Sequence, residues 1–178
     1  MFRRWRRIDQ PGLELARIEI AARGVTVCSM LVDGGDAPFG LRYLWMLDKD
    51  WRTRSLRLES MADDDGWLHI ERAGAASWKI DGKPAAHLDG CQELDLSATP
   101  FCNALAIRRT SEEDEDFTAA YISAADLSVT PSRQRYEKLG RRKWRYVDLG
   151  VANGFTAVLD LDADGLVKTY EGLFEALS

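Results

Sequence analysis

The chain of 178 residues has few of the side chains on which most enzymes depend. It contains two histidines, His69 and His87, and neither stands in an H-E-x-x-H motif. The three cysteines, Cys28, Cys91 and Cys102, form no C-x-x-C pair, so we expect buried free thiols instead of a disulfide framework or a zinc knuckle. The G-x-S-x-G, G-x-x-x-x-G-K-[ST] and G-x-G-x-x-G motifs are absent as well. We therefore expect a binding protein rather than an enzyme, with no catalytic residue, no resident metal and no cofactor.

Long apolar segments are also missing. No apolar run approaches the roughly 20 residues that a membrane-spanning helix needs, and the basic N-terminal stretch is not followed by the apolar segment of a secretory signal. The net charge of -5 gives no general attraction for nucleic acid or for an anionic membrane. We expect a soluble, cytoplasmic protein without nucleic-acid partners, and the oligomeric state stays open.

What the sequence does have is turns. Asp-Gly or Asn-Gly occurs six times, at 33–34, 65–66, 81–82, 89–90, 153–154 and 164–165. These pairs favour tight hairpins because both residues tolerate positive φ. Between them the chain alternates with period two, which predicts strands. The predicted strands are 25–32, 41–47, 53–61, 67–72, 77–80, 105–109, 117–123, 133–138, 143–148 and 155–162. We expect residues 1–178 to form a single, mainly β domain whose curved antiparallel sheet approaches a barrel.

Helical signals are few, and we expect one or two short helices. Thr99-Pro100 predicts a capped turn that runs through Asn103. The tail Tyr170–Leu177 predicts two further helical turns. The expected strand at 105–109 places Arg108 and Arg109 on opposite faces, so one of them would point inward. An inward arginine needs an anionic partner, either Asp95 or a ligand.

Residues 160–171 read DLDADGLVKTYE and match the calcium-loop pattern D-x-[DN]-x-[DN]-G-x₅-E at every required position. The ligand positions fall on Asp160, Asp162, Asp164 and Glu171. An EF-hand, however, requires a helix before the loop, and the preceding residues alternate as a strand. We interpret the segment as a hairpin turn and expect no calcium to bind.

Two further groups of residues leave alternatives open. Glu93, Asp95, Asp148, Asp160 and Asp162 could meet and hold Mg²⁺ in a metal-dependent phosphate-ester hydrolase, although a solvated strand face explains them more simply. The basic and aromatic stretch 133–146 has the composition of a single-stranded nucleic-acid site, and it equally describes a hairpin with a charged edge. We favour the simpler reading in both cases.

The segment from 90 to 109 carries a resemblance to a known family. Its pattern is G-C-x-x-x-D-L-x-x-T-P-F-x-N-x-L-x-I-R-R, carried by Gly90, Cys91, Asp95, Leu96, Thr99, Pro100, Phe101, Asn103, Leu105, Ile107, Arg108 and Arg109. The stretches 48–54, Gln134-x-Tyr136 and 162–174 agree with it. The chain thereby resembles the bacterial putative glycolipid-binding proteins. The resemblance implies a curved β-rich domain similar to lipoprotein carriers, and it brings no catalytic residues.

The leading hypothesis is therefore non-enzymatic binding of a lipid or glycolipid in an apolar cavity or groove. We expect acyl chains to contact aromatic side chains on a concave face and polar head groups to contact Asp95, Asn103 and Arg108. The predicted ligand-binding residues are Tyr43, Trp45, Trp67, Asp95, Asn103, Arg108 and Tyr136. The alternatives are the metal-dependent hydrolase and an interaction module that has no cavity.

Overall fold

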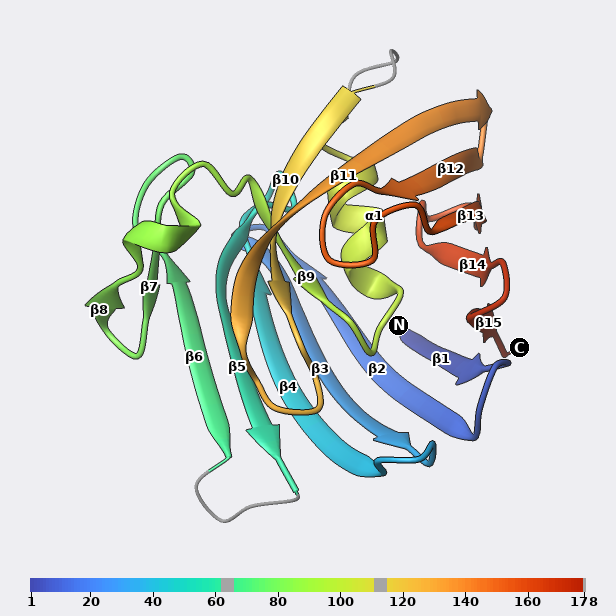
Figure 1. Ribbon diagram of the computed structural model, residues 1–178, viewed down its shortest axis with the longest axis horizontal. Coiled ribbons are helices and arrows are strands. Elements are labelled where there is room, and N and C mark those ends of the chain that lie inside the picture. Colours follow the sequence, from blue (N-terminus) through green and yellow to red (C-terminus); the bar gives the residue numbers. More distant parts are fainter. Residues whose placement is uncertain (62–65, 111–114, 178) are drawn as a thin grey trace.

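The computed structural model describes residues 1–61, 66–110 and 115–177, and its strands form one sheet (Figure 1). The strands before the first helical segment are β1 (Phe2–Arg7), β2 (Gly12–Ala21), β3 (Gly24–Asp33), β4 (Phe39–Leu47), β5 (Thr53–Ser60), β6 (Trp67–Arg72), β7 (Trp78–Ile80) and β8 (Lys83–Pro84). The 3₁₀-helix η1 (Ala86–Leu88) and β9 (Glu93–Leu96) lead to the α-helix α1 (Phe101–Ile107). The remaining strands are β10 (Glu115–Ile122), β11 (Val129–Gly140), β12 (Lys143–Asp148), β13 (Thr156–Leu161), β14 (Val167–Tyr170) and β15 (Phe174–Ala176).

The strand order is simple. It runs from β8 down to β1 and continues from β15 down to β9, so the strands nearest the two chain termini are neighbours. Neighbouring strands are antiparallel except β9 and β10, which are parallel. Among the described residues β8 and β9 form the two ends of the order and do not pair with each other. The prediction of a mainly β chain with a curved antiparallel sheet is confirmed, and the sheet curls without closing into a barrel.

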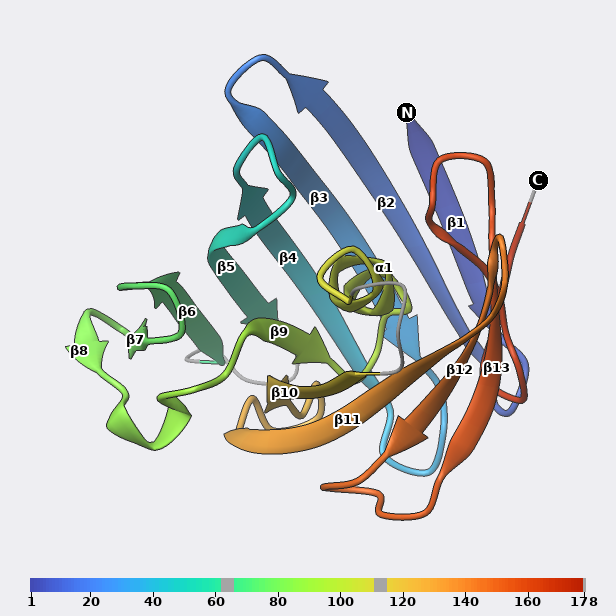
Figure 2. The same ribbon diagram turned by 90° about the horizontal axis from the view of Figure 1, so that it is seen from above.

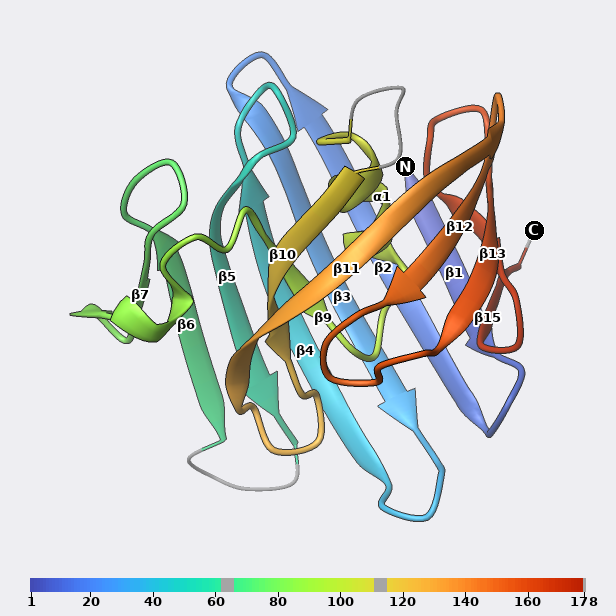
Figure 3. The same cartoon turned by 45° about the horizontal axis from the view of Figure 1, so that its top comes forward.

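The helix α1 fills the inside of the curl. Seen from above, it stands end-on between β2–β5 on one side and β10–β13 on the other (Figure 2), and β10 and β11 cross in front of it (Figure 3). All seven of its residues are buried. Phe101 and Leu105 belong to the larger apolar core, which is built mainly on β1–β7 and also includes residues of β9 and β10. Ala106 and Ile107 belong to a second core on β10–β15. The helix therefore joins the two halves of the sheet through one continuous interior.

Period-two alternation gives the sheet one inner and one outer face. On β2, Ala16 and Ile18 are fully buried against α1 and its neighbours, whereas Leu15 and Arg17 point outward. The same alternation continues on β3 and β4 in register with β2. Leu15 is thus opposite Met30 on the outer face.

The Asx-Gly signals mark real turns. Asp81 and Gly82, which join β7 to β8, both have positive φ, at 50° and 78°, as a two-residue hairpin of this type requires. Gly165 lies between the antiparallel strands β13 and β14 with φ of 73°. The turn predicted at Asp65 lies outside the described residues.

The prediction of a strand at 105–109 was wrong. The helix predicted to end at Asn103 continues to Ile107, and Arg108 is its C-terminal cap. The Thr99 hydroxyl accepts the Phe101 N–H at 3.2 Å and starts the helix. A helix buried on every side shows no 3.6-residue pattern, so the alternation of Leu105 and Ile107 was mistaken for a strand.

The prediction of a helical tail was also wrong. Residues 170–177 instead contain the end of β14, a turn at Gly172 with φ of 76°, and β15. The physical reason is tertiary: β1 would otherwise be an edge, and β15 pairs with it from Trp5 to Arg7. Separately, no helix among the described residues is long and apolar enough to cross a membrane.

Candidate functional site

A pocket of about 220 Å³ opens beside the first turn of α1, on the inner side of the sheet. Its walls come from β9, β10, β12 and β14 together with the loop that follows β12. The polar and aromatic residues that line it include Asp95, Asn103, Tyr121, Tyr146, Asp148, Phe155 and Tyr170. We call this the tyrosine–carboxylate pocket.

Asp95 stands on β9 and is fixed on both oxygens. Its Oδ1 accepts from the Cys102 thiol at 3.0 Å, and its Oδ2 accepts a short hydrogen bond from the Gln134 amide. Burial raises the pKa of Asp95 and outweighs these hydrogen bonds, which lower it; the nearby charge of Asp148 raises it further. A ligand that donated a further hydrogen bond to Asp95 would therefore stabilise the charged form of this carboxyl group.

Asp148 ends β12 and is the second carboxylate. Its Oδ2 accepts from the Tyr146 hydroxyl at 3.1 Å, and its Oδ1 accepts the Gly150 N–H at 2.7 Å. None of the ion pairs found in the described parts of the chain involves Asp148 or Asp95. Neither carboxylate therefore has a cationic partner among the residues that the structure describes.

Aromatic rings form the wall around these carboxylates. The Tyr146 ring lies 5.4 Å from that of Tyr136, 6.1 Å from that of Tyr170 and 6.2 Å from that of Phe155, measured between centroids. Burial raises the pKa of the Tyr146 and Tyr170 phenols above their ordinary range, and the charge of Asp95 adds to the effect. Both remain neutral and can donate hydrogen bonds.

A chain of amides and hydroxyls supports the pocket from behind. The Asn103 amide donates to the Tyr136 hydroxyl at 3.1 Å, and that hydroxyl donates to the Gln134 carbonyl oxygen at 3.3 Å. Gln134 in turn binds Asp95. The network fixes the orientation of Asp95 from α1 and β11 at once.

A second, more polar cleft of about 490 Å³ adjoins the pocket, and Ser97 and Tyr121 line both. Its other side is formed by Arg7 and Asp33, whose side chains pair at 2.7 Å. The two spaces together reach the size usual for ligand sites, about 300–1,000 Å³. A ligand larger than one ring could extend from the pocket into the cleft.

The predicted site residues fall into separate groups. Asp95, Asn103 and Tyr136 come together at the pocket, as described above. Tyr43 and Trp45 instead belong to the core: the Tyr43 hydroxyl donates to Glu14 at 2.6 Å, and the Trp45 indole donates to Thr53 at 2.7 Å. Trp67 is 57% exposed on β6. The inner face that was expected to carry acyl chains is filled by α1, because Phe101 stacks edge-on against Trp45 at 5.5 Å.

Arg108 lies away from the pocket. Its guanidinium donates to the carbonyl oxygens of Ala104, Gly165 and Asp164 at 3.0, 2.7 and 2.7 Å and stacks over the Trp51 ring at 4.3 Å. It therefore ties the end of α1 to the β13–β14 turn. The expectation that an inward arginine would meet Asp95 depended on the strand at 105–109, which does not form.

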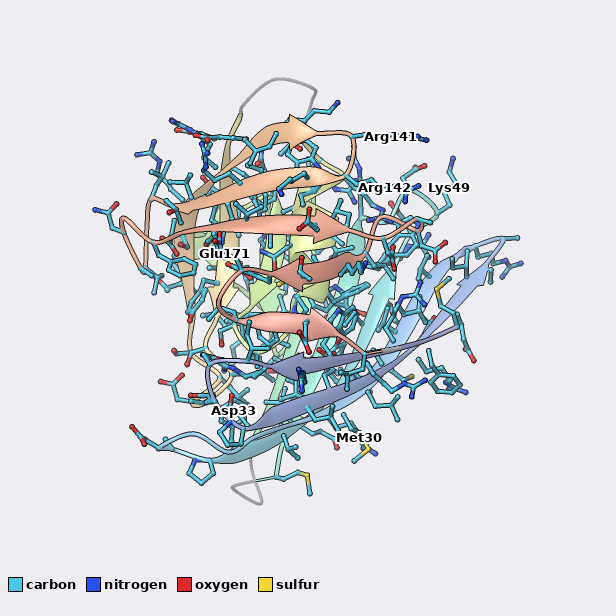
Figure 4. The ribbon with its side chains drawn as sticks, turned by 90° about the vertical axis from the view of Figure 1, so that its right-hand side faces the viewer. Met30, Asp33, Lys49, Arg141, Arg142 and Glu171 are labelled. Carbon is cyan, nitrogen blue, oxygen red and sulfur yellow. The ribbon has the colours of Figure 1, made fainter. Side chains whose placement is uncertain are left out.

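The calcium-like loop is held together by arginines. The Arg3 guanidinium pairs with Asp162 at 3.1 Å and with Asp164 at 2.5 Å, and Asp162 also accepts two backbone N–H groups of the turn. Glu171 accepts the N–H of Val158 at 2.9 Å, beyond the far end of β14 (Figure 4). The twelfth position thus lies at the opposite end of the hairpin from the turn.

The two alternative sites of the sequence are dispersed in the structure. Of the five carboxylates of the hydrolase alternative, only Asp95 and Asp148 line the pocket. No group of three or more His, Cys, Asp or Glu suited to a metal is found in residues 1–61, 66–110 and 115–177. In the basic stretch, Tyr136 and Trp144 are buried, whereas Arg145 points outward and pairs with Glu137 at 2.8 Å.

Sequence reasoning missed part of the pocket. Tyr121 and Tyr170 were not singled out, and Asp148 was considered only as a metal ligand. One signal was present: Tyr146 and Asp148 alternate on the predicted strand 143–148 and so share a face. No local sequence pattern predicts that this face lies close to Asp95 on β9.

Comparisons with known proteins agree with one another. The sequence model of the family described as "Putative glycolipid-binding" matches residues 2–176. The crystal structure of a DUF1089 family protein from Pseudomonas aeruginosa is 31% identical in sequence and superimposes with a TM-score of 0.80, over 93% of this chain and 92% of that one. No curated protein matches the sequence. The likeness covers both halves of the sheet and the helix between them.

Proposed function

Because the chain belongs to the putative glycolipid-binding family, we propose that it binds a glycolipid and holds the sugar head group in the tyrosine–carboxylate pocket. The observation that carries the proposal is the convergence of two carboxylates, Asp95 and Asp148, within a wall of tyrosine rings. Neither pairs with a cationic side chain in residues 1–61, 66–110 and 115–177.

This combination suits a sugar. Carboxylates accept hydrogen bonds from sugar hydroxyls, and charged acceptors form the stronger bonds. The Tyr170 phenol can donate and accept, and the Tyr146 phenol, which donates to Asp148, can accept. Their rings offer flat apolar surface to the C–H face of a sugar. The adjoining polar cleft beside Arg7 and Asp33 leaves room for a second sugar unit.

The same pocket does not suit an acyl chain. Its volume of about 220 Å³ is small, and its carboxylates would lose hydration without gaining a partner. The apolar part of the lipid therefore lies outside the pocket. Recognition of the polar head is the function that this site supports.

The test is a binding titration with matched variants. A panel of glycolipid head-group sugars is titrated into the protein by calorimetry, and the melting temperature is followed in parallel. Asp148→Asn removes one charged acceptor, worth about 1.5–3 kcal/mol, so the dissociation constant should rise roughly tenfold to a hundredfold. Asp160→Asn is the control, because Asp160 lies on β13 outside the pocket and pairs there with Lys143.

Two results would count against the proposal. One is that no sugar of the panel binds the wild-type protein or raises its melting temperature. The other is that Asp148→Asn and Asp160→Asn weaken binding equally, which would place the sugar elsewhere on the molecule.

A further inference from the structure

The outer face of the sheet carries a groove that the proposed function does not use. It has a volume of about 560 Å³ and lies across β1–β5, on the side opposite α1. Its apolar lining includes Phe2, Leu15 and Met30, which are 59%, 47% and 58% exposed. In Figure 4 Met30 lies on the outer side of the sheet, with the rest of the molecule on the other side. Large apolar side chains gathered in a solvent-exposed hollow indicate a binding surface.

Strand register explains how the groove is built. One cross-strand row runs from Phe2 through Arg17, Cys28 and Leu44 to Arg57. The neighbouring row places Leu15, Met30 and Arg42 side by side on β2, β3 and β4. In each row apolar side chains lie next to an arginine. The arginine is Arg57 on β5 in the first row and Arg42 on β4 in the second.

The charge of the groove contrasts with that of the whole chain. Three arginines and one glutamate line it, which gives +2, although the chain carries a net charge of -5. Arg42 pairs with Glu59 at 2.6 Å and Arg17 pairs with Glu19 at 3.2 Å. Arg57 has no carboxylate partner in the part of the chain that the structure describes. One cation is thus left for an external anion.

We propose that this groove binds a single-chain amphiphile with an anionic head group. The acyl chain lies over Leu15, Met30 and Leu44, and the head group pairs with Arg57. The apolar floor of the groove favours an acyl chain, and the unpaired Arg57 favours an anionic head group over a cationic one. A second copy of this protein fits less well, because the arginines of two such faces would meet one another.

The groove contains its own reporter. Cys28 lines it and is half-buried, whereas Cys91 and Cys102 are 0% and 2% exposed. A chain lying in the groove covers Cys28 and slows its reaction with a thiol reagent. The rate of Cys28 modification therefore shows whether the ligand binds in the groove, which a calorimetric titration alone does not show.

The experiment uses dodecyl phosphate below its micelle concentration, with calorimetry and Cys28 protection as readouts. Burying each further methylene contributes about 0.8 kcal/mol, so affinity should rise about fourfold per carbon from octyl to dodecyl phosphate. Dodecyltrimethylammonium should bind several times more weakly. Asp148→Asn should leave dodecyl phosphate binding unchanged, which separates this site from the sugar pocket.

Variants on the exposed face test the assignment without disturbing the core. Met30→Glu should weaken binding about tenfold or more, because it places a carboxylate under the acyl chain. Arg57→Gln should cost about twofold to fivefold, the value of an exposed ion pair. Ile20→Glu is the matched control: Ile20 is on β2, is 59% exposed and does not line the groove.

Five outcomes would overturn the proposal. Three are an affinity that does not depend on chain length, an affinity that does not depend on head-group charge, and a loss of binding in Ile20→Glu as large as that in Met30→Glu. Binding seen only with phosphatidylglycerol vesicles would make the face a membrane-docking surface. Sedimentation showing a dimer that Met30→Glu dissociates would make it a contact between copies of the chain.

Discussion

The two faces of β1–β5 use apolar side chains in opposite ways. On the inner face Trp45 and Leu56 are fully buried against α1 and its neighbours, and the tyrosine–carboxylate pocket lies beyond them, in the other half of the sheet. On the outer face Phe2 and Met30 are largely exposed along an arginine-lined groove. Inner residues are therefore constrained by stability, whereas outer residues are free to be selected for contact with a ligand. Substitutions can separate the two roles.

The largest expected effect is on the inner face. Phe101→Ala should lower the free energy of unfolding by about 3–5 kcal/mol, because it leaves a cavity between Trp45 and Trp51. Phe2→Ala, the same change on the exposed side, should stay within about 0.5 kcal/mol of the wild type. Urea unfolding of both variants measures the difference, and similar losses would remove the distinction between the faces.

A smaller effect is expected where a carboxyl group is buried under the inner face. Glu14 is 2% exposed, and Ser29 and Tyr43 donate hydrogen bonds to its Oε1. Burial raises the pKa of Glu14. The stability that its neutral form contributes is fully present below its ordinary pKa of 4.5 and is lost as the pH rises through the raised, folded-state value.

Glu14→Gln stays uncharged at every pH, so its stability relative to the wild type should increase from about pH 4.5 to about pH 7. Urea unfolding at both pH values measures the change. Glu59→Gln on the exposed side is the control and should show no such trend. A constant difference between wild type and Glu14→Gln would mean that folding does not raise the pKa of Glu14.

The smallest effect concerns the thiols. In the native protein one thiol in three should react with a thiol reagent, since burial raises the pKa of Cys91 to about 11 and also raises that of Cys102. Cys28→Ser should abolish the native reaction and change the free energy of unfolding by less than about 0.5 kcal/mol. Reaction of more than one native thiol would show that the inner face opens to solvent.

The sequence predicted the parts of the fold that local chemistry decides. The strands Trp67–Arg72 and Lys143–Asp148 have the predicted bounds because turn residues and alternation agree there. The end of α1 was missed because burial on all sides hides a helical period. The placement of Arg108 was missed because its partner Gly165 is 57 residues away.

The candidate site follows the same division. Asp95 and Asn103 were singled out from one short segment, and the structure places both at one pocket. That they bind a ligand stays a prediction. Tyr121 and Tyr170 reach the pocket only through the pairing of distant strands, which no single stretch of sequence encodes.

The pairing of β1 with β15 has a consequence for how the chain folds. On either side of it the sheet is built largely from hairpins between strands that are close in sequence. Among the described residues, this seam alone joins the two halves of the strand order, and the Trp5 indole crosses it to the Val167 carbonyl, 162 residues away, at 2.7 Å. Contacts so distant along the chain are entropically costly to close and slow folding. During synthesis β1 therefore pairs with β2 alone until β15 has left the ribosome, and its open edge is a place where the nascent chain needs protection from aggregation.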